Sequence, residues 1–435
     1  MEKFVQLTLS LVVILLLVRL SALLSRWLGM SAVAIQIMVG ILLGTSLFNF
    51  LGAPIVLGTW GSSTPTPLHG ILKILGEVGL IQLMFLGGLH TDWPKFKRDL
   101  SLISSIGLWV FVSTAVAISI IAHFFVDRWA GALAISAIMG ASSFGISVYN
   151  LNEMKLLGSR AAYVTSGAAI LSGLFGLLLM VASLSVNYVT AYGLFRMVIA
   201  VSWFLGKLIM FFAISYFLTS RFLRRIAKTG FKRSPRQTLI GYFLLVAALY
   251  AWGAMHFGSF AAIVVASLGG GLLGASALEV KESLTKGLRS STASILVGIF
   301  FIILGMGVNF KEAGGNGLHL ILLFVTMACT KLAGCWISTR KVFDRQQERL
   351  LTMIGTLPQG EMGIVIAAYL FSRGLISPSN FNIAMIVVVT LTMLSPVAMK
   401  IVEKVSLRGV PQWGTTKQSS EIPSLPTRQA GHRLQ

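Results

Sequence analysis

Two charged residues, Lys331 and Glu361, stand inside long apolar segments and are the residues of this chain most suited to chemistry. Lys331 lies within LHLILLFVTMACTKLAGCWI, and Glu361 lies within LLTMIGTLPQGEMGIVIAAYLF. A charge near the middle of a membrane helix costs free energy, so it is a candidate functional group by default. An amine and a carboxylate in such positions can bind a proton, hold a cation or attract an anion.

Hydroxyl groups in two upstream apolar segments form a second set of candidates. Neutral hydroxyl and carbonyl oxygens can replace the water around a cation, although they do not by themselves couple its movement to a proton. The hydroxyls in question are those of Ser142, Ser143, Ser147, Thr165, Ser166 and Ser172.

The segments that carry these residues belong to a chain with the composition of a polytopic membrane protein. Apolar residues make up 55% of it, charged residues only 11%, and its mean hydropathy is +0.84. A window of about 20 apolar residues is long enough to cross a bilayer as a helix. The sequence therefore predicts an all-α fold with thirteen transmembrane helices, at 4–24, 30–48, 70–90, 101–123, 129–150, 158–185, 192–220, 238–255, 257–278, 290–309, 317–338, 350–372 and 381–402.

Lys and Arg are shared unevenly between the two sides of this predicted membrane domain, which covers residues 1–405. One set of alternating connections plus the C-terminal tail holds 25 of them, and the other set holds 5. Because cytoplasmic connections carry the excess, we expect an inner-membrane protein with its N-terminus outside and its C-terminus in the cytoplasm. The same bias, facing anionic membrane lipid, accounts for the net charge of +21, so we expect no nucleic-acid binding. Residues 406–435 are polar, without apolar periodicity, and are predicted to be a disordered cytoplasmic tail.

The two halves of the chain are similar, which predicts an inverted repeat with one copy around 30–185 and the other around 257–402. AVAIQIMVGILLGTSLF in the second span matches FAAIVVASLGGGLLGASAL in the ninth, and LIQLMFLGGLHTDW in the third matches GIFFIILGMGVNFKE in the tenth. Since seven spans separate the members of each pair, matched helices run in opposite directions. Transporters built this way form their substrate site near the middle of the membrane from discontinuous helices.

Two spans in corresponding positions contain residues that weaken a helix. The twelfth includes LPQGEMG, in which Pro358 lacks a backbone donor and Gly360 adds flexibility, and the fifth includes GASSFGIS with Gly145. Such residues also occur at ordinary kinks, which neighbouring helices satisfy. The repeat favours two broken helices at a common site.

Taken together, these motifs resemble the monovalent cation:proton antiporter superfamily, specifically its second family of bacterial sodium or potassium/proton exchangers. The resemblance covers about residues 5–402 and rests on GEVGLIQLMFLGGLHTD, IFFIILGMGVNF, Lys331 and PQGEMGIVIAAYLFSRGLIS. It implies a core domain with two crossed broken helices, a panel domain that usually forms a homodimer, and alternating access by movement between them.

The chain departs from the family pattern in its sixth span. The family usually has an acidic pair there, and the last aspartate binds the cation and the proton in competition. In this chain Ser172 and Gly173 stand at those positions, and residues 158–185 contain no Asp or Glu. By resemblance Lys331 would lie beside the missing aspartate, where it could carry the proton itself, stay charged and attract an anion, or have a structural role. The family counterpart of Glu361 is usually a core residue rather than the ion ligand.

The resemblance predicts a secondary transporter that exchanges sodium or potassium for protons through an atypical site without aspartate. Two alternatives stay open: a carrier for an anion or small organic acid that uses Lys331, and a non-transporting sensor or partner subunit. Enzyme activity, a metal centre and a cofactor are not expected, because the six His and two Cys form no nucleophile–base or metal-ligand constellation. The sequence assigns no role to His90 or Lys207.

Overall fold

The computed structural model describes nine parts of the chain, and the statements below refer to them. They are residues 2–28, 30–44, 48, 67–90, 96, 98–187, 193–218, 291–311 and 316–407. The predicted spans at 238–255 and 257–278 and the tail beyond Leu407 lie outside the described residues. The last described helix continues to Leu407, two residues past the predicted end of the membrane domain at residue 405.

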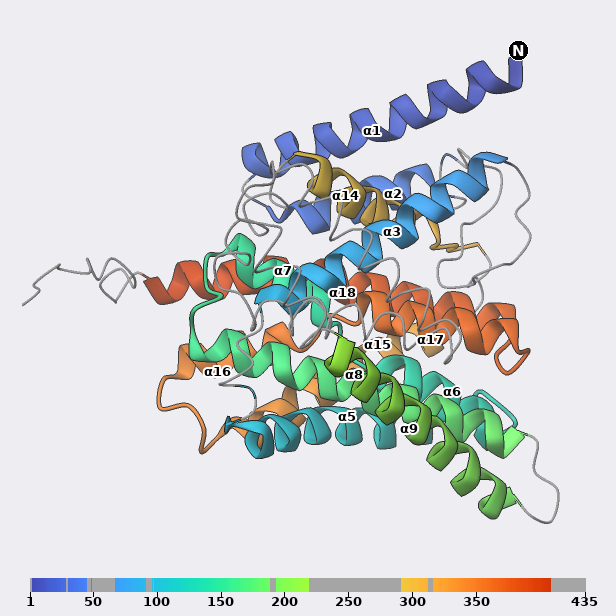
Figure 1. Cartoon of the computed structure of the whole chain (residues 1–435), viewed down its shortest axis with the longest axis vertical. Helices are drawn as coiled ribbons and strands as arrows, with labels where there is room; N and C mark the ends of the chain where they lie inside the picture. Colours follow the sequence, from blue (N-terminus) through green and yellow to red (C-terminus); the bar gives the residue numbers. More distant parts are fainter. Residues whose placement is uncertain are drawn as a thin grey trace, which may run out of the picture.

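The described helices pack in two groups, which Figure 1 shows above and below one another. The smaller group, called the panel group here, consists of α1 (Glu2–Leu28), α2 (Ala32–Leu43), α3 (Pro67–His90) and α14 (Ser291–Met306). The larger, called the core group, consists of α5 (Leu100–His123), α6 (Trp129–Gly140), α7 (Phe144–Glu153), α8 (Arg160–Asn187), α15 (Gly317–Thr339), α16 (Gln346–Gly355), α17 (Gly360–Ser372) and α18 (Pro378–Leu407). Helix α9 (Gly193–Leu218) packs against α8, and contacts of α7 with α3 and of α18 with α2 join the two groups.

Seven helical segments of the described part are long and apolar enough to cross a membrane. They are Leu11–Leu28, Leu100–His123, Trp129–Glu153, Arg160–Val186, Gly317–Thr339, Gln346–Ser372 and Pro378–Val402. This agrees with the all-α membrane fold expected from the sequence. The described residues do not cover all thirteen predicted spans, so that count stays a prediction.

Glycines allow the panel helices to approach one another closely. A Cβ atom on Gly40 of α2 would lie 2.9 Å from the Cα of Gly305 in α14, and one on Gly79 of α3 would lie 2.7 Å from the carbonyl carbon of Leu296 in α14. Small residues at such crossings let helix backbones touch in an apolar environment, where packing rather than hydrophobic burial holds helices together. Gly40 and Gly79 therefore serve helix packing.

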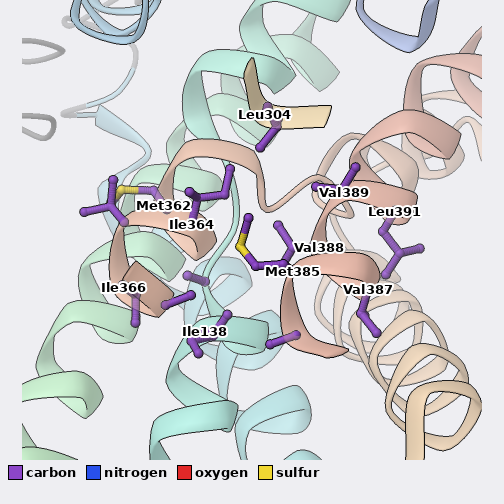
Figure 2. Packing of buried hydrophobic residues seen from close by; sticks show 14 of the residues in the cluster. Ile138, Leu304, Met362, Ile364, Ile366, Met385, Val387, Val388, Val389 and Leu391 are labelled. Carbon is purple, nitrogen blue, oxygen red and sulfur yellow. The ribbon is translucent and has the colours of Figure 1, made fainter. Parts of the chain in front are cut away.

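In the core group, branched and flexible apolar side chains fill the space between α6, α17 and α18. Figure 2 shows Ile138 of α6 facing this cluster, with Met362 and Ile366 from α17 and Met385 and Val388 from α18. All five are at most 5% exposed. The cluster packs the helix before the first interruption described next, α6, against the helix after the second, α17.

The core group contains both predicted broken helices. The fifth span stops at Gly140 and restarts at Phe144, with an extended segment between them, and the twelfth stops at Gly355 and restarts at Gly360. Pro358 lies inside the second interruption as expected. Gly360 begins α17 with a φ of +32°, and a Cβ there would overlap the side chain of Ile146, so both backbone and space favour glycine.

One detail of the break prediction was wrong. Gly145 does not interrupt the fifth span but lies in the first turn of α7, and the interruption is Ala141, Ser142 and Ser143. The reason is that a hydrogen-bonded cap, rather than a glycine, ends the break: the Ser143 hydroxyl accepts from the amide of Ile146 at 3.1 Å and starts α7.

Candidate functional site

The two interruptions cross in the middle of the core group and satisfy each other's backbone. The amide of Ser143 donates to the carbonyl of Pro358 at 2.7 Å, and the Ser142 hydroxyl donates to the carbonyl of Thr356 at 2.9 Å. The Ser147 hydroxyl donates to the carbonyl of Gly355 at 2.6 Å. Helix ends buried in a membrane need such partners, because no water reaches their free carbonyls. The serines of one broken helix thus cap the C-terminal end of the other.

Lys331 reaches the first interruption from α15. Its side chain is fully buried, and its Nζ donates to the carbonyl of Ala141 at 2.7 Å and to the hydroxyl of Ser142 at 2.9 Å. Ala141 is the C-cap of α6, so the ammonium lies at the negative end of that helix dipole. Within the described ranges no carboxylate lies within ion-pair distance of it. Its positive charge is held by neutral oxygens and a helix end, the same groups that could ligate a metal cation.

Glu361 lies at the N-terminal end of a helix, whereas Lys331 lies at a C-terminal end. It is fully buried in the first turn of α17, and its carboxylate accepts from the amide of Gly145 at 3.0 Å and from the hydroxyl of Ser143. A carboxylate at a helix N-terminus is stabilised by the free amides and the positive dipole end. Glu361 therefore serves the N-terminal ends of α7 and α17 at once, as a built-in anion at the crossing.

Ser172 and Gly173 on α8, expected from the sequence to stand at the positions of an acidic pair, face this crossing. The Ser172 hydroxyl donates to the carbonyl of Gly140 at 3.0 Å and lies 3.4 Å from the hydroxyl oxygen of Ser142. A Cβ on Gly173 would lie 2.7 Å from the methyl carbon of Met362 and 3.4 Å from the carbonyl oxygen of Ser142. The structure thus places these two residues next to Ser142, the serine that holds Lys331.

The other two hydroxyls of α8 do not join that cluster. Ser166 donates to the carbonyl of Ala162 one turn back on its own helix, at 2.7 Å. Thr165 is fully buried, lies beside Gly355 at the end of α16, and its hydroxyl has no partner in the described part of the chain. Neither makes a hydrogen bond to Lys331 or Glu361 among the described residues. Thr165 lies near the crossing, and neither hydroxyl is brought to the two charges.

Gln359 and Thr392 are site residues that sequence reasoning missed. The Gln359 amide donates to the carbonyl of Met139 near the end of α6, and the amide of Gly360 donates to the Thr392 hydroxyl at 3.1 Å. Gln359 could have been found, because it is a polar residue between Pro358 and Glu361 within an apolar span. Thr392 gives no such signal, since a single threonine in an apolar helix usually bonds its own backbone. The side chains of His90 and Lys207 lie outside those that the structure describes.

The two charged side chains, Lys331 and Glu361, have different surroundings at the crossing. Lys331 contacts the oxygens of Ala141 and Ser142 at the C-terminal end of α6, and the Ser172 hydroxyl lies next to that of Ser142. This set of oxygens is suited to a small cation. Around Glu361 lie the amide and hydroxyl donors of α7, a set suited to an anion, and the carboxylate already occupies it. The crossing can therefore hold one positive charge among these oxygens, either the lysine ammonium or a small cation.

Comparison with known proteins gives consistent matches over almost the whole chain. The family model described as sodium/hydrogen exchanger, transmembrane, matches residues 12–402. The Na(+)/H(+)-K(+) antiporter GerN of Bacillus cereus is 25% identical over 392 residues, covering 89% of this chain and 94% of that protein. The Na(+)/H(+) antiporter of Enterococcus hirae is 22% identical, covering 86% and 92%.

A longer relative and a solved structure extend the comparison. The glutathione-regulated potassium-efflux system protein KefC of Escherichia coli is 24% identical over 340 residues, and the match spans about half of that protein, 52%. The sodium proton antiporter MjNhaP1 from Methanocaldococcus jannaschii superposes with a TM-score of 0.65 at 14% identity, covering 92% of this chain and 99% of that one. At this identity the structural match speaks for the fold alone.

Proposed function

Because this chain belongs to the sodium/hydrogen exchanger family of membrane proteins, we propose that it is a secondary transporter that exchanges sodium or potassium for a proton. The observation that carries the proposal is the Lys331 ammonium, held by the Ala141 carbonyl and the Ser142 hydroxyl at the break. These oxygens are the ligands that a dehydrated cation would use. The names of GerN and the Enterococcus hirae relative supply the cation class.

In this proposal Lys331 takes over the proton chemistry of the absent aspartate. When its amine carries the proton, the ammonium occupies the oxygens of Ala141 and Ser142. When the proton leaves, the neutral amine releases those oxygens, and a sodium or potassium ion binds to them with help from Ser172. Two positive charges cannot share one small site of low dielectric, since their repulsion is not screened there. One proton is therefore exchanged for one cation, and the charge of the site stays the same.

Glu361 has a different role in this proposal. It holds the N-terminal ends of α7 and α17 together through Ser143 and Gly145, and its negative charge balances the one positive charge of the cation site. This also weakens the case for an anion carrier. The free amides at the start of α7, which would bind a transported anion, already have the Glu361 carboxylate as their partner.

The movement and assembly of the protein complete the proposal. The core group would move against the panel group to open the crossing to either side, and the chain would work as a homodimer in the inner membrane with its C-terminus in the cytoplasm. The family resemblance supports the movement and the dimer, and the uneven distribution of Lys and Arg supports the orientation. Membrane lipid is the surrounding partner.

The test is proton flux in liposomes that contain the purified protein and a trapped pH-sensitive dye. We expect sodium or potassium, but not choline, to move protons in the opposite direction, at a rate that an imposed membrane potential does not change. Liposomes without protein serve as the control. Proton flux driven only by organic or inorganic anions would favour the anion carrier. The absence of proton flux with every solute would favour a sensor or partner subunit. Either result would overturn the proposal.

A further inference from the structure

A cavity of about 380 Å³ lies between α1 and the helices α2, α7 and α14, apart from the crossing. Its wall on α1 consists of Val18, Arg19, Ala22, Ser25 and Arg26, one face of that helix. The opposite wall consists of Ala32 and Gln36 of α2, Tyr149 and Glu153 of α7, and Ile295 of α14. The cavity therefore lies where the panel group meets α7, the second half of the first broken helix.

The two arginines give this cavity a positive charge that nothing in the described residues balances. Neither guanidinium has an ion pair or hydrogen bond in the described part of the chain. The one carboxylate in the wall, Glu153, is already occupied: it accepts from the Ser31 hydroxyl at 2.9 Å and pairs with Lys400 at 3.3 Å. Arg19 and Arg26 thus face the cavity as two cations, and no carboxylate of the described residues pairs with either of them.

Arg19 is costly where it stands, because α1 is apolar on both sides of it. It lies seven residues from Arg26, or about 10 Å along the helix axis, and so within the predicted span rather than at its end. An arginine inside a membrane segment calls for an anionic or polar partner. The hydroxyl of Tyr149 makes no hydrogen bond within the described residues and lines the same cavity, so it adds a neutral donor.

We propose that this cavity binds a phosphate group through Arg19, Arg26 and Tyr149. The guanidinium fork matches phosphate oxygens with paired hydrogen bonds, and two arginines match the charge of a phosphate better than a single lysine would. The outward side of α1 is apolar, with Leu20 53%, Leu23 60% and Trp27 82% exposed, so an acyl chain can lie beside the cavity while its phosphate enters. A soluble phosphate from the cytoplasmic side would use the same groups.

The ligand would touch α1 of the panel group and α7 of the core group together. Because α7 begins at the Ser143 cap of the crossing and ends at Glu153 in the cavity wall, a bound phosphate would connect the transport site to the panel group through one short helix. Its presence should therefore change the rate of transport, although binding itself is measured without transport.

The test uses the full chain purified in detergent. Native mass spectrometry measures retention of phosphatidylglycerol against the zwitterionic phosphatidylcholine, and melting curves with added inorganic phosphate measure the soluble source. We expect the wild type to bind either phosphatidylglycerol, in preference to phosphatidylcholine, or inorganic phosphate. Arg19→Gln and Arg26→Gln should each reduce the affinity for that ligand about tenfold, since each removes a charged hydrogen-bonding partner. Lys341→Gln removes an exposed basic charge outside the cavity and is the matched control.

The two measurements distinguish a lipid phosphate from a soluble phosphate and test whether the site exists. Retention of phosphatidylglycerol that depends on both arginines identifies a lipid head group, and stabilisation by inorganic phosphate alone with the same dependence identifies a soluble anion. Should Arg19→Gln fail to fold, Arg26→Gln at the exposed end of α1 still decides. If Arg26→Gln binds both probes as the wild type does, or if Lys341→Gln reduces binding equally, the site does not exist.

Discussion

Lys331 and Glu361 are held by two adjacent serines of the same helix interruption. Lys331 donates to the Ser142 hydroxyl at 2.9 Å, and the Ser143 hydroxyl donates to the Glu361 carboxylate. The two charges do not pair directly within the described structure, where no ion pair between them lies within 4.0 Å. Each instead faces the helix end of opposite polarity, the ammonium at the C-terminus of α6 and the carboxylate at the N-terminus of α7. The break thus keeps a positive and a negative site apart.

The proton-carrying role of Lys331 predicts different outcomes for two substitutions. Lys331→Gln removes the titrating amine, and Lys331→Arg keeps a positive charge that does not leave at any ordinary pH. We expect both variants to lose proton-coupled cation flux in liposomes while still being expressed in the membrane. Wild-type exchange by the arginine variant would show that the lysine need not give up its proton.

An acid at position 173 should strengthen cation binding. Gly173→Asp places a carboxylate beside Ser142, where it attracts a cation and Lys331 alike, and we expect the sodium concentration for half-maximal exchange to fall roughly tenfold, equivalent to about 1.4 kcal/mol. Because the new Cβ would meet the methyl carbon of Met362 at 2.7 Å, the variant is best combined with Met362→Ala.

Two comparisons complete that experiment. Gly173→Asn with Met362→Ala has the same shape without the charge and should not gain affinity. Ser172→Asp tests the neighbouring position and would lose the hydrogen bond to the Gly140 carbonyl. A folded Gly173→Asp variant with unchanged cation dependence would mean that the ion binds elsewhere.

Glu361 should be needed for stability more than for proton transfer. Glu361→Gln keeps an acceptor for Ser143 and Gly145, whereas Glu361→Ala leaves both buried donors unpaired, at a cost of about 1–3 kcal/mol for each donor. We expect a lower melting temperature in detergent for the alanine variant and measurable exchange by the glutamine variant. Complete loss of proton flux in a stable glutamine variant would instead make Glu361 the proton carrier.

A hydrogen bond to Asp99, which lies just outside the membrane-spanning segments, predicts a pH dependence of stability. The Tyr163 hydroxyl donates to the Asp99 carboxylate at 2.5 Å, and together with Arg98 it lowers the pKa of Asp99 below its ordinary value of 3.8. Since the folded pKa is depressed, the stabilisation is present at neutral pH and is lost as the pH falls and Asp99 takes up its proton. Tyr163→Phe should therefore melt lower than the wild type at pH 7, and the difference should shrink in acid. A difference that is the same at all pH values would show that only packing was lost.

The distribution of Lys and Arg predicts the topology. A reporter fused after Arg236 should be cytoplasmic, and one inserted near Ser63 should be external. Protease accessibility in oriented vesicles gives an independent measurement. Reporters on the same side would contradict the thirteen-span arrangement and the inverted repeat with it.

The membrane class, the two spans that contain the breaks and the two intramembrane charges could be predicted from the sequence, because each depends on local properties. Apolar length decides whether a segment can leave water, Pro358 and Gly360 weaken a helix wherever they stand, and a charge within an apolar run is visible at once. The described helices and the family match confirm the fold that these features predicted.

The partners of those charges could not be predicted, because they depend on contacts between distant parts of the chain. Ala141, which binds Lys331, is 190 residues from it, and Gly145, which binds Glu361, is 216 residues from it. Gly145 was taken for the break because a glycine weakens an isolated helix, but the carboxylate of Glu361 and the cap of Ser143 start α7 in front of it. Hydrogen bonds in a medium without water are decided by which polar groups the packed helices bring together, and only the tertiary structure brings these together.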